Sequence, residues 1–271
     1  MGKLDGQVAF ITGAARGQGR AHAVRLAQEG ADIIGIDICQ QLKVVGYPMS
    51  TPEDLDETVR QVEALGRKMV AFQADVRDLP ALQKAFDEGV AALGPVQIVV
   101  ANAGIGPGGF ATDDEQWDEV VEVNLKGVWN TGRVAIPSIV ANGQGGSIIL
   151  TSSTGGLTGS PSVVAGMLGY TAAKHGVIGL MRSWANYLAP HYIRVNSVAP
   201  TTVATPMANN GDVSMILQHV PELANSLTNA IPVQAVEASD VAAAVAWLAS
   251  DDARYVTGSV IPVDAGTVNR R

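Results

Sequence analysis

The stretch VAFITGAARGQG, residues 8–19, decides the fold. Residues 8–12 have the composition of a buried strand, and glycines stand at positions 13, 17 and 19 of the turn that follows. When such a turn opens a helix, its glycines allow a tight bend and let backbone N–H groups approach a pyrophosphate at the positive end of the helix. The stretch therefore predicts a phosphate-binding turn, with an ordinary glycine-rich turn as the alternative.

Short apolar runs alternate with longer helical patterns along the rest of the chain. The runs predict strands at residues 7–12, 31–37, 68–73, 96–102, 146–152, 193–199 and 259–264. Helical patterns fill residues 17–29, 52–65, 79–92, 115–140, 170–189 and 239–249. Because this alternation is typical of parallel βαβ units, and no linker or repeat divides the chain, we predict an α/β protein. Residues 1–271 should form a single-domain, Rossmann-like doubly wound fold with a seven-stranded parallel sheet.

Composition excludes several classes of protein. Hydrophobic residues make up 47% of the 271 residues and charged residues 16%, which indicates a packed globular protein. The formal net charge of −8 argues against nucleic-acid partners and anionic membrane surfaces. A single cysteine, Cys39, excludes a disulfide framework and a cysteine-rich metal site, and no metal is expected. No apolar stretch is long enough to span a membrane, so we expect a cytoplasmic protein.

Asp37 ends the second predicted strand, some twenty residues beyond the glycine turn. A carboxylate at this place can accept both ribose hydroxyls of NAD, whereas the alternative is an aspartate that only caps a loop. A 2′-phosphate about 4 Å away would be repelled by about 4 kcal/mol at an effective dielectric constant near 20. Arg16 would offset part of this repulsion, but no arginine or lysine directly follows Asp37. NAD is therefore the predicted cofactor.

A second group of reactive side chains is YTAAK, residues 170–174. On a helix, residues four positions apart lie on one face, so the Tyr170 phenol and the Lys174 ammonium can meet. The strand just before, SIILTSS, ends in Ser152 and Ser153. Doubly wound sheets bind their ligands at the carboxyl ends of the strands, so these serines and the Tyr–Lys pair point to one site.

Together these residues resemble the short-chain dehydrogenase/reductase family. Its motifs occur in the family's order over nearly the whole chain: TGAARGQG (12–19), Asp37, DV (75–76), NAG (102–104), Asn124 in VNLKG, Ser153, YTAAK and VTGSVIPVDAG (256–266). The resemblance implies a catalytic tetrad of Asn124, Ser153, Tyr170 and Lys174. It also implies a set of cofactor-binding residues: Gly13, Arg16, Gly17, Gln18, Gly19, Asp37, Ile38, Asp75, Val76, Asn102, Ala103, Gly104, Tyr170, Lys174, Pro200, Val203 and Thr205.

The tetrad implies transfer of a hydride between an alcohol carbon and the nicotinamide. A tyrosine has an ordinary pKa of about 10 and is a poor base at neutral pH, but a lysine ammonium and a positive nicotinamide both favour its phenolate. By resemblance, Ser153 would hold the substrate oxygen against Tyr170. Asn124 would hold a water that links Lys174 to solvent.

Departures from the commonest pattern of the family indicate a subgroup. Ser153 and Tyr170 are 17 positions apart, which is wider than usual, and the excess in GSPSVVAGM (159–167) predicts a longer loop beside the substrate pocket. This spacing leaves Ser152 as a minor alternative for the serine role. Thr201 follows Pro200 where most members have glycine. With the insertion at 38–52, these features resemble the mycofactocin-associated, carveol-dehydrogenase-like members.

The subgroup resemblance implies NAD that is held without exchange and is reoxidised in place by mycofactocin or another external acceptor. The family resemblance implies a homotetramer in which the helices near 115–140 and 170–189 pair between subunits. The expected substrate is a hydrophobic secondary alcohol or its ketone. The enzymatic alternative is an NAD(P)H-dependent carbonyl or 3-oxoacyl reductase, and the non-enzymatic alternative is a dinucleotide sensor.

Two segments should cover the site. Residues 38–52 follow Asp37 and carry an apolar set that gains by packing, and we expect them to fold over the adenosine: Leu42, Val44, Val45, Tyr47, Pro48 and Met49. Residues 201–230 should cover the substrate pocket. Their apolar residues suggest its lining, although they could also be plain core: Met207, Met215, Ile216, Leu217 and Val220.

Overall fold

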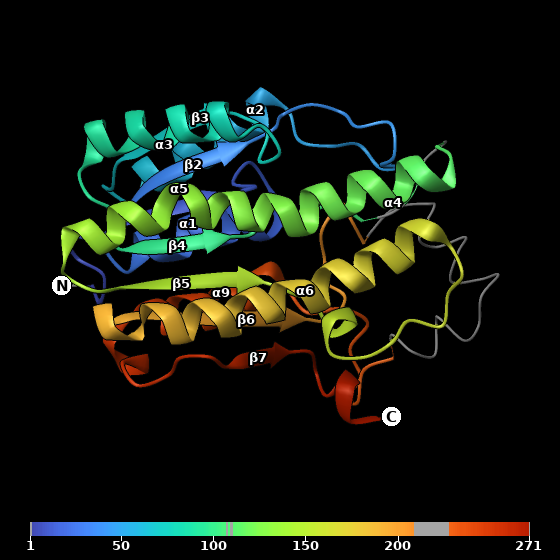
Figure 1. Cartoon of the computed structure of the whole chain (residues 1–271). Coiled ribbons are helices and arrows are strands. Elements are labelled where there is room, and N and C mark those ends of the chain that lie inside the picture. Colours follow the sequence, from blue (N-terminus) through green and yellow to red (C-terminus); the bar gives the residue numbers. More distant parts are fainter. Residues whose placement is uncertain (1, 107, 109–110, 209–227, 271) are drawn as a thin grey trace.

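The computed structural model describes residues 2–106, 108, 111–208 and 228–270 as a doubly wound α/β fold (Figure 1). Its seven strands form one sheet in the order β3-β2-β1-β4-β5-β6-β7, and every neighbouring pair is parallel. The strands are β1 (Val8–Thr12), β2 (Asp32–Asp37), β3 (Met69–Gln73), β4 (Ile98–Ala101), β5 (Gly146–Thr151), β6 (Ile193–Pro200) and β7 (Val260–Val263). The predicted seven-stranded, single-domain fold is confirmed.

Helices cover both faces of the sheet. On one face lie α3 (Leu79–Leu93), α5 (Gly127–Asn142) and α6 (Ala165–Leu188), and α5 and α6 are in front in Figure 1. The other face is covered by α1 (Gly17–Gln28), α2 (Pro52–Glu63) and α9 (Ala238–Ala249). Helix α4 (Asp113–Val121) precedes α5 and packs against α6. Short helical turns stand at Thr154–Gly156, Ala189–His191, Asp251–Ala253 and Thr267–Arg270.

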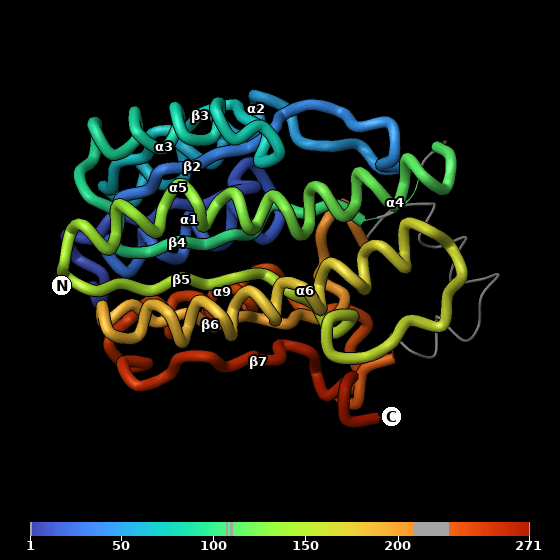
Figure 2. Tube along the Cα trace, viewed as in Figure 1, coloured from blue at the N-terminus to red at the C-terminus, as the bar shows by residue number. Residues whose placement is uncertain are grey.

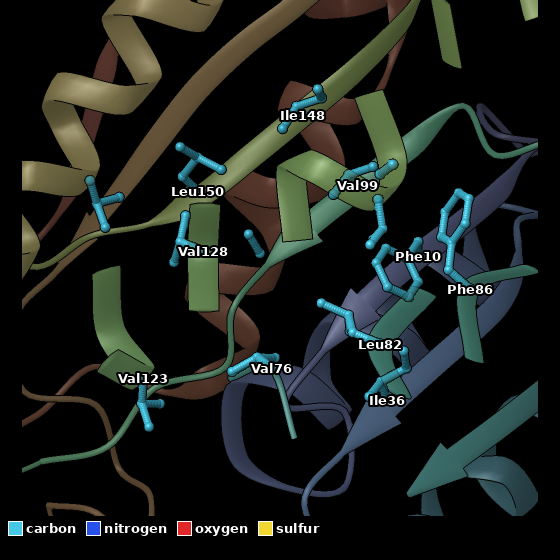
Figure 3. Close-up of a cluster of buried hydrophobic side chains, with 14 of the residues drawn as sticks. Phe10, Ile36, Val76, Leu82, Phe86, Val99, Val123, Val128, Ile148 and Leu150 are labelled. Atoms are coloured by element: carbon cyan, nitrogen blue, oxygen red, sulfur yellow. The ribbon is translucent and has the colours of Figure 1, made fainter. Parts of the chain in front are cut away.

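The strands alternate their side chains between two cores, as the two-residue period of a strand requires. Phe10 and Val99 enter the cluster under α3, α5 and α6, where Phe10 meets Phe86 edge to face with ring centroids 5.0 Å apart (Figure 3). Ile11 and Val100 enter the opposite cluster under α1, α2 and α9. Both faces are therefore buried, which explains why the strands read as continuous apolar runs.

The helix predicted at 115–140 is a longer and interrupted element. Helical structure runs from Asp113 to Asn142, but residues Glu122–Lys126 form a π-helical turn. The Asn124 side chain donates to the Val120 carbonyl at 3.0 Å, the group that an α-helical N–H of residue 124 would bind. A bond from the side chain of a predicted site residue thus accompanies the irregularity, which the apolar pattern did not reveal.

The helix predicted at 170–189 begins five residues earlier, at Ala165. Part of the stretch 159–167, predicted as a longer loop, is therefore the first turn of α6, and only 159–164 remain outside the helix. Packing against α4 explains the extension, because a Cβ built on Gly169 would lie 3.4 Å from Trp117 atoms. Val163 at the loop's end is 93% exposed.

The insertion between β2 and α2 reaches past the carboxyl ends of the strands toward α4 (Figure 2). Part of the predicted substrate-covering segment 201–230, including Met215, Ile216, Leu217 and Val220, lies outside the described residues. Among the helices that are described, none has both the length and the apolar character needed to cross a membrane. The cytoplasmic location stays a prediction.

Candidate active site

The glycine turn joins β1 to α1 at the carboxyl edge of the sheet. Gly13 and Gly17 have φ of +71° and +54°, values that other residues rarely adopt. A Cβ on Gly13 would lie 2.9 Å from the Ala103 Cα, and a Cβ on Gly19 would collide with the Gly13 carbonyl. The turn is therefore tight because strand β4 and helix α1 both approach its backbone.

A cleft opens above this turn. It is lined by the turn, by the ends of β2, β3 and β4, and by the insertion. The buried Gln18 Oε1 has no hydrogen-bond partner among the described residues. The glycines of the turn leave room for a phosphate to approach the backbone, and an unpartnered polar atom lies at the wall of the cleft. Such a cleft fits a dinucleotide.

Asp37 lies at the end of β2, 7% exposed, and lines the cleft. Its Oδ2 accepts from the Ala15 N–H at 2.9 Å, and its Oδ1 accepts from the Cys39 N–H at 3.1 Å and from the Ser50 hydroxyl at 2.6 Å. These donors fix the carboxylate in one orientation. Neighbouring Ile38, which the family resemblance places among the cofactor-binding residues, also lines the cleft.

Asp75 and Val76 line the cleft after β3, where the resemblance places the adenine. The Arg77 guanidinium holds Asp75 through a fork of bonds, with Nη2 2.6 Å and Nε 2.9 Å from Oδ2. Its Nη1 donates to Glu119 Oε1 at 3.1 Å, and these carboxylates raise the pKa of Arg77. The motif recognised in the sequence ended at Val76, so Arg77 was not predicted as a residue that holds Asp75. Its position two residues after that aspartate could have suggested the ion pair.

Asn124 is fully buried under the segment that follows β4. Its Oδ1 accepts from the Ile105 N–H at 3.1 Å, and its Nδ2 donates to the Ile105 carbonyl at 2.9 Å. A Cβ on Gly104 would lie 2.6 Å from Asn124 Oδ1 and 3.5 Å from Lys174 Nζ. Gly104 therefore lets Asn124 and Lys174 converge. The backbone N–H groups of Asn102 and Ala103, just before it, both donate to the Thr12 hydroxyl oxygen. Both residues line the cleft.

Lys174 and Tyr170 lie on one face of α6, as their spacing predicted. Lys174 Nζ is 5.6 Å from the Tyr170 ring centroid and donates to the Thr151 carbonyl at 2.9 Å. The Ser153 hydroxyl lies near enough to the Tyr170 phenol to lower the pKa of that phenol. The Ser152 hydroxyl instead donates to the Lys174 carbonyl at 2.9 Å, inside the protein, which leaves Ser153 as the serine that faces the tyrosine.

Burial perturbs both groups of the Tyr–Lys pair. It lowers the pKa of Lys174 from 10.5 to about 8, because an ammonium is poorly solvated there. Burial also raises the pKa of Tyr170 above its ordinary value, although the nearby Ser153 hydroxyl opposes this shift. A tyrosine and a lysine with perturbed pKa values on one helix face, with the lysine next to the cleft-lining Gly104, are typical of acid–base chemistry.

The insertion is tied to the rest of the site by polar contacts. The Arg16 guanidinium donates to the Pro48 carbonyl, and the Lys43 ammonium pairs with Glu115 at 2.8 Å. The Tyr47 hydroxyl accepts from the Gly106 N–H at 3.1 Å. Much of the predicted apolar set is buried: Leu42, Val44, Val45 and Tyr47 are all less than 9% exposed. Sequence reasoning saw these apolar residues but missed Ser50, which carries no motif.

The segment after β6 closes the other side. Thr205 lines the cleft, and a Cβ on Gly17 would lie 3.3 Å from its Cγ2. Val203 is buried and forms a bridge with Val236, just beyond Pro200 at the end of β6. Thr201 stands where glycine is usual, and its hydroxyl donates to Asn229 Oδ1 at 3.1 Å. Among the described residues, no cluster of His, Cys, Asp or Glu is arranged to hold a metal.

The fold and this site define a dinucleotide-dependent oxidoreductase. A family model described as enoyl-(acyl carrier protein) reductase matches residues 13–268. The chain is 49% identical to (−)-trans-carveol dehydrogenase of Rhodococcus erythropolis over 278 residues, which cover 98% of this chain and 99% of that protein. It belongs to the short-chain dehydrogenase/reductase family.

Solved structures agree with this assignment. Carveol dehydrogenase from Mycobacterium avium in complex with NAD is 48% identical, with a TM-score of 0.93 over 99% of this chain and 100% of that chain. A short chain dehydrogenase from Mycobacterium paratuberculosis bound to NAD is 49% identical, with a TM-score of 0.92 over the same shares of the two chains. Both are complexes with NAD, the cofactor predicted here from Asp37. The family resemblance and its carveol-dehydrogenase-like character are confirmed.

Proposed function

We propose that this protein uses NAD to interconvert a hydrophobic secondary alcohol and its ketone. The observation that carries the proposal is the convergence of Ser153, Tyr170 and Lys174 beside a cleft that holds Asp37 at its far end. The similarity to a carveol dehydrogenase supports an apolar alcohol of terpene size as the substrate class.

Each polar group of the tetrad has a task in alcohol oxidation. Ser153 holds the substrate hydroxyl against the Tyr170 oxygen, and Tyr170 takes the hydroxyl proton as general base. The Lys174 ammonium stabilises the phenolate form of Tyr170, which becomes a neutral phenol when it accepts that proton, and would hold the nicotinamide ribose of bound NAD. Asn124 positions the segment beside Lys174 and a water that returns the proton to solvent. NAD, when bound, supplies the carbon that accepts the hydride.

The insertion supports a second part of the proposal: NAD is retained between turnovers and is reoxidised in place by an external acceptor such as mycofactocin. Its buried contact with Gly106 and its bond to Arg16 would have to break before a dinucleotide could leave the cleft, whereas the exposed Lys43–Glu115 pair adds little. Each added 1.4 kcal/mol of contact slows dissociation about tenfold if association is unchanged. A freely exchanging coenzyme would need no such cover.

A panel of alcohols assayed with the purified protein and a dye acceptor tests the activity. Oxidation of hydrophobic secondary alcohols in preference to small charged hydroxy acids is the expected result, and the reverse preference contradicts the proposal. The alternative, a biosynthetic carbonyl or 3-oxoacyl reductase, would reduce ketones or thioesters with NADPH. The Asp37 carboxylate opposes that cofactor because it repels a 2′-phosphate. A dinucleotide sensor would oxidise none of the alcohols.

We also propose that the protein is a homotetramer. Trp129 on α5 and Tyr187 on α6 are 41% and 71% exposed, and large apolar side chains at helix surfaces are typical of subunit contacts. Light scattering at micromolar concentration should give four times the 28.1 kDa chain mass. A monomeric species alone contradicts this assembly.

A further inference from the structure

Tyr47 belongs to the insertion, yet its side chain contacts the opposite wall of the cleft. The residue is only 6% exposed and lines the cleft. Its hydroxyl accepts a hydrogen bond from the Gly106 N–H at 3.1 Å, and both groups are buried. A Cβ on Gly106 would lie 3.9 Å from Tyr47 Cε1 and 3.3 Å from Met207 Cγ, so ring and backbone are in close contact.

The backbone that Tyr47 binds is also bound by a tetrad residue. Asn124 holds the N–H and the carbonyl of Ile105, the residue directly before Gly106. Tyr47 and Asn124 therefore fix one dipeptide from two different elements, the insertion and the π-helical turn. One residue earlier, Gly104 lies where Asn124 Oδ1 and Lys174 Nζ converge. A shift at Gly106 would be passed along a few bonds to the Lys174 environment.

The chemistry of the contact makes it sensitive to a single atom. A buried backbone N–H needs an acceptor, and the Tyr47 oxygen provides it. Burial raises the pKa of Tyr47 above its ordinary value, so the group is a neutral phenol at physiological pH and its oxygen accepts from the Gly106 N–H. Phenylalanine would keep the ring packing and lose only this acceptor.

We propose that Tyr47 is a positioning residue that couples closure of the insertion to the geometry of the tetrad. It acts on Asn124 through the backbone of Gly106 and Ile105. Through Asn124 it affects the position of Lys174 and, with it, that of the nicotinamide ribose. The inference rests on the proposed function, because it assigns Tyr47 to the same cleft. With the insertion closed, the hydroxyl holds the 104–106 backbone in the position that the tetrad requires. With the insertion open, that backbone loses its acceptor.

The Tyr47→Phe variant tests this inference through two measurements on the purified protein. The first is the rate at which the nucleotide is released. It is followed with protein that carries the reduced form, NADH, whose fluorescence is recorded after rapid dilution. The second is the split between kcat and KM for an alcohol with a dye acceptor. Faster release by about tenfold and a lower kcat by about tenfold are expected, which corresponds to 1.4 kcal/mol each. KM for the alcohol should stay close to that of the wild type, because Tyr47 acts on the cofactor side.

Two variants serve as controls. Lys43→Ala removes an ion pair of the same insertion whose side chains are 65% and 44% exposed, so NAD release should change little. Tyr255→Phe removes a hydroxyl from a residue that is 89% exposed and distant in the chain. A lower melting temperature of Tyr47→Phe with wild-type NAD release and kcat would mean packing only and overturns the inference.

The design separates this inference from the proposed function. NAD release is measured without any alcohol, so it decides the role of Tyr47 even if no alcohol in the panel is oxidised. If the protein purifies without nucleotide, the dissociation constant for added NADH replaces the release rate. Wild-type affinity and wild-type kcat in Tyr47→Phe would then overturn the inference.

Discussion

The Ser50 hydroxyl donates a buried hydrogen bond of 2.6 Å to Asp37 Oδ1. Ser50 stands at the end of the insertion, one residue before the Thr51 cap of α2, and Asp37 stands at its beginning. The insertion therefore returns to the carboxylate from which it departs. This closed loop places its apolar residues over the cleft and fixes the carboxylate that selects the cofactor.

Replacing Asp37 with serine should change the cofactor preference. Without the carboxylate, the ribose hydroxyls lose an acceptor and a 2′-phosphate is no longer repelled. We expect the ratio of NADP-linked to NAD-linked activity to rise at least about tenfold, or 1.4 kcal/mol, and overall affinity for NAD to fall. Steady-state rates with each cofactor measure this. Asp56→Ser on the exposed side of α2 is the control, and an unchanged ratio in Asp37→Ser contradicts the selection argument.

Tyr170→Phe should lower alcohol oxidation by about 10²–10⁴-fold, because it removes the general base. Bound NAD should remain, since the ribose is held by Lys174. Lys174→Ala should damage oxidation and cofactor binding together. Single-turnover rates and the nucleotide content of each purified variant separate these effects. Near-normal turnover of Tyr170→Phe would refute the assignment of the base.

Lys174 should reduce the stability of the fold. Its folded pKa of about 8 lies below the 10.5 of the unfolded chain, so the unfolded state binds more protons between those values. The penalty is complete below pH 8 and vanishes as the pH rises through 10.5. Lys174→Met, which also loses the bond to Thr151, should raise the free energy of unfolding of nucleotide-free protein by about 2 kcal/mol at pH 7.

Urea unfolding of protein refolded without NAD measures this difference. The exposed Lys84→Met variant, whose lysine side chain is 78% exposed, should change little. Lower stability of Lys174→Met at pH 7 would show that the bond to Thr151 outweighs the burial of the charge.

His22 should make the fold sensitive to acid. The ring is fully buried in α1, and burial lowers its pKa from 6.5 to about 4, while the nearby Asn102 side chain opposes the shift only in part. The unfolded chain therefore binds the proton first as the pH falls. His22 contributes stability above pH 6.5 that is lost toward pH 4, at most about 3 kcal/mol.

The comparison of pH profiles for unfolding tests the His22 effect. In His22→Gln the slope between pH 6.5 and pH 4 should be smaller than in the wild type, whereas His175→Gln on the exposed face of α6 should keep the full slope. Identical slopes in His22→Gln and the wild type would remove His22 from the acid response.

Periodicity predicted the sheet well because both faces of every central strand are covered. Phe10 and Ile11 enter different cores, so adjacent positions are both apolar and the run is conspicuous. The start of α6 at Ala165 was not predicted; the N-terminal part of this helix packs against α4, where Gly169 lies close to Trp117, a residue far away in the sequence. Tertiary packing of this kind leaves no local pattern.

The site was predictable where local spacing carries the chemistry, as with Tyr170 and Lys174. Asp75 and Asp37 were predicted because each has a fixed position in a motif. Arg77 and Ser50, which donate hydrogen bonds to them, belong to no motif and were missed. The π-helical turn at Asn124 was missed for a similar reason: the side-chain bond to Val120 that accompanies it leaves no mark in the apolar pattern.

The insertion gives the last prediction, that purified protein carries NAD or NADH. Its apolar side chains are already buried against the cleft wall, and its polar contacts with Arg16 and Gly106 close the way out. We expect release to require that these contacts break together, and therefore to be slow relative to turnover. Under this condition an artificial electron acceptor supports many turnovers, whereas added NAD alone supports few.

Denaturation of extensively dialysed protein, followed by an enzymatic assay of the supernatant, measures the retained nucleotide. We expect close to one nucleotide per chain, because one chain supplies all the described residues that line the cleft. A parallel sample incubated with labelled NAD should exchange little of it before denaturation. Protein that loses its nucleotide on dialysis and regains full multiple-turnover activity with NAD alone would show that the closed insertion opens freely, and that Ser50, Tyr47 and Arg16 hold the loop without holding the cofactor.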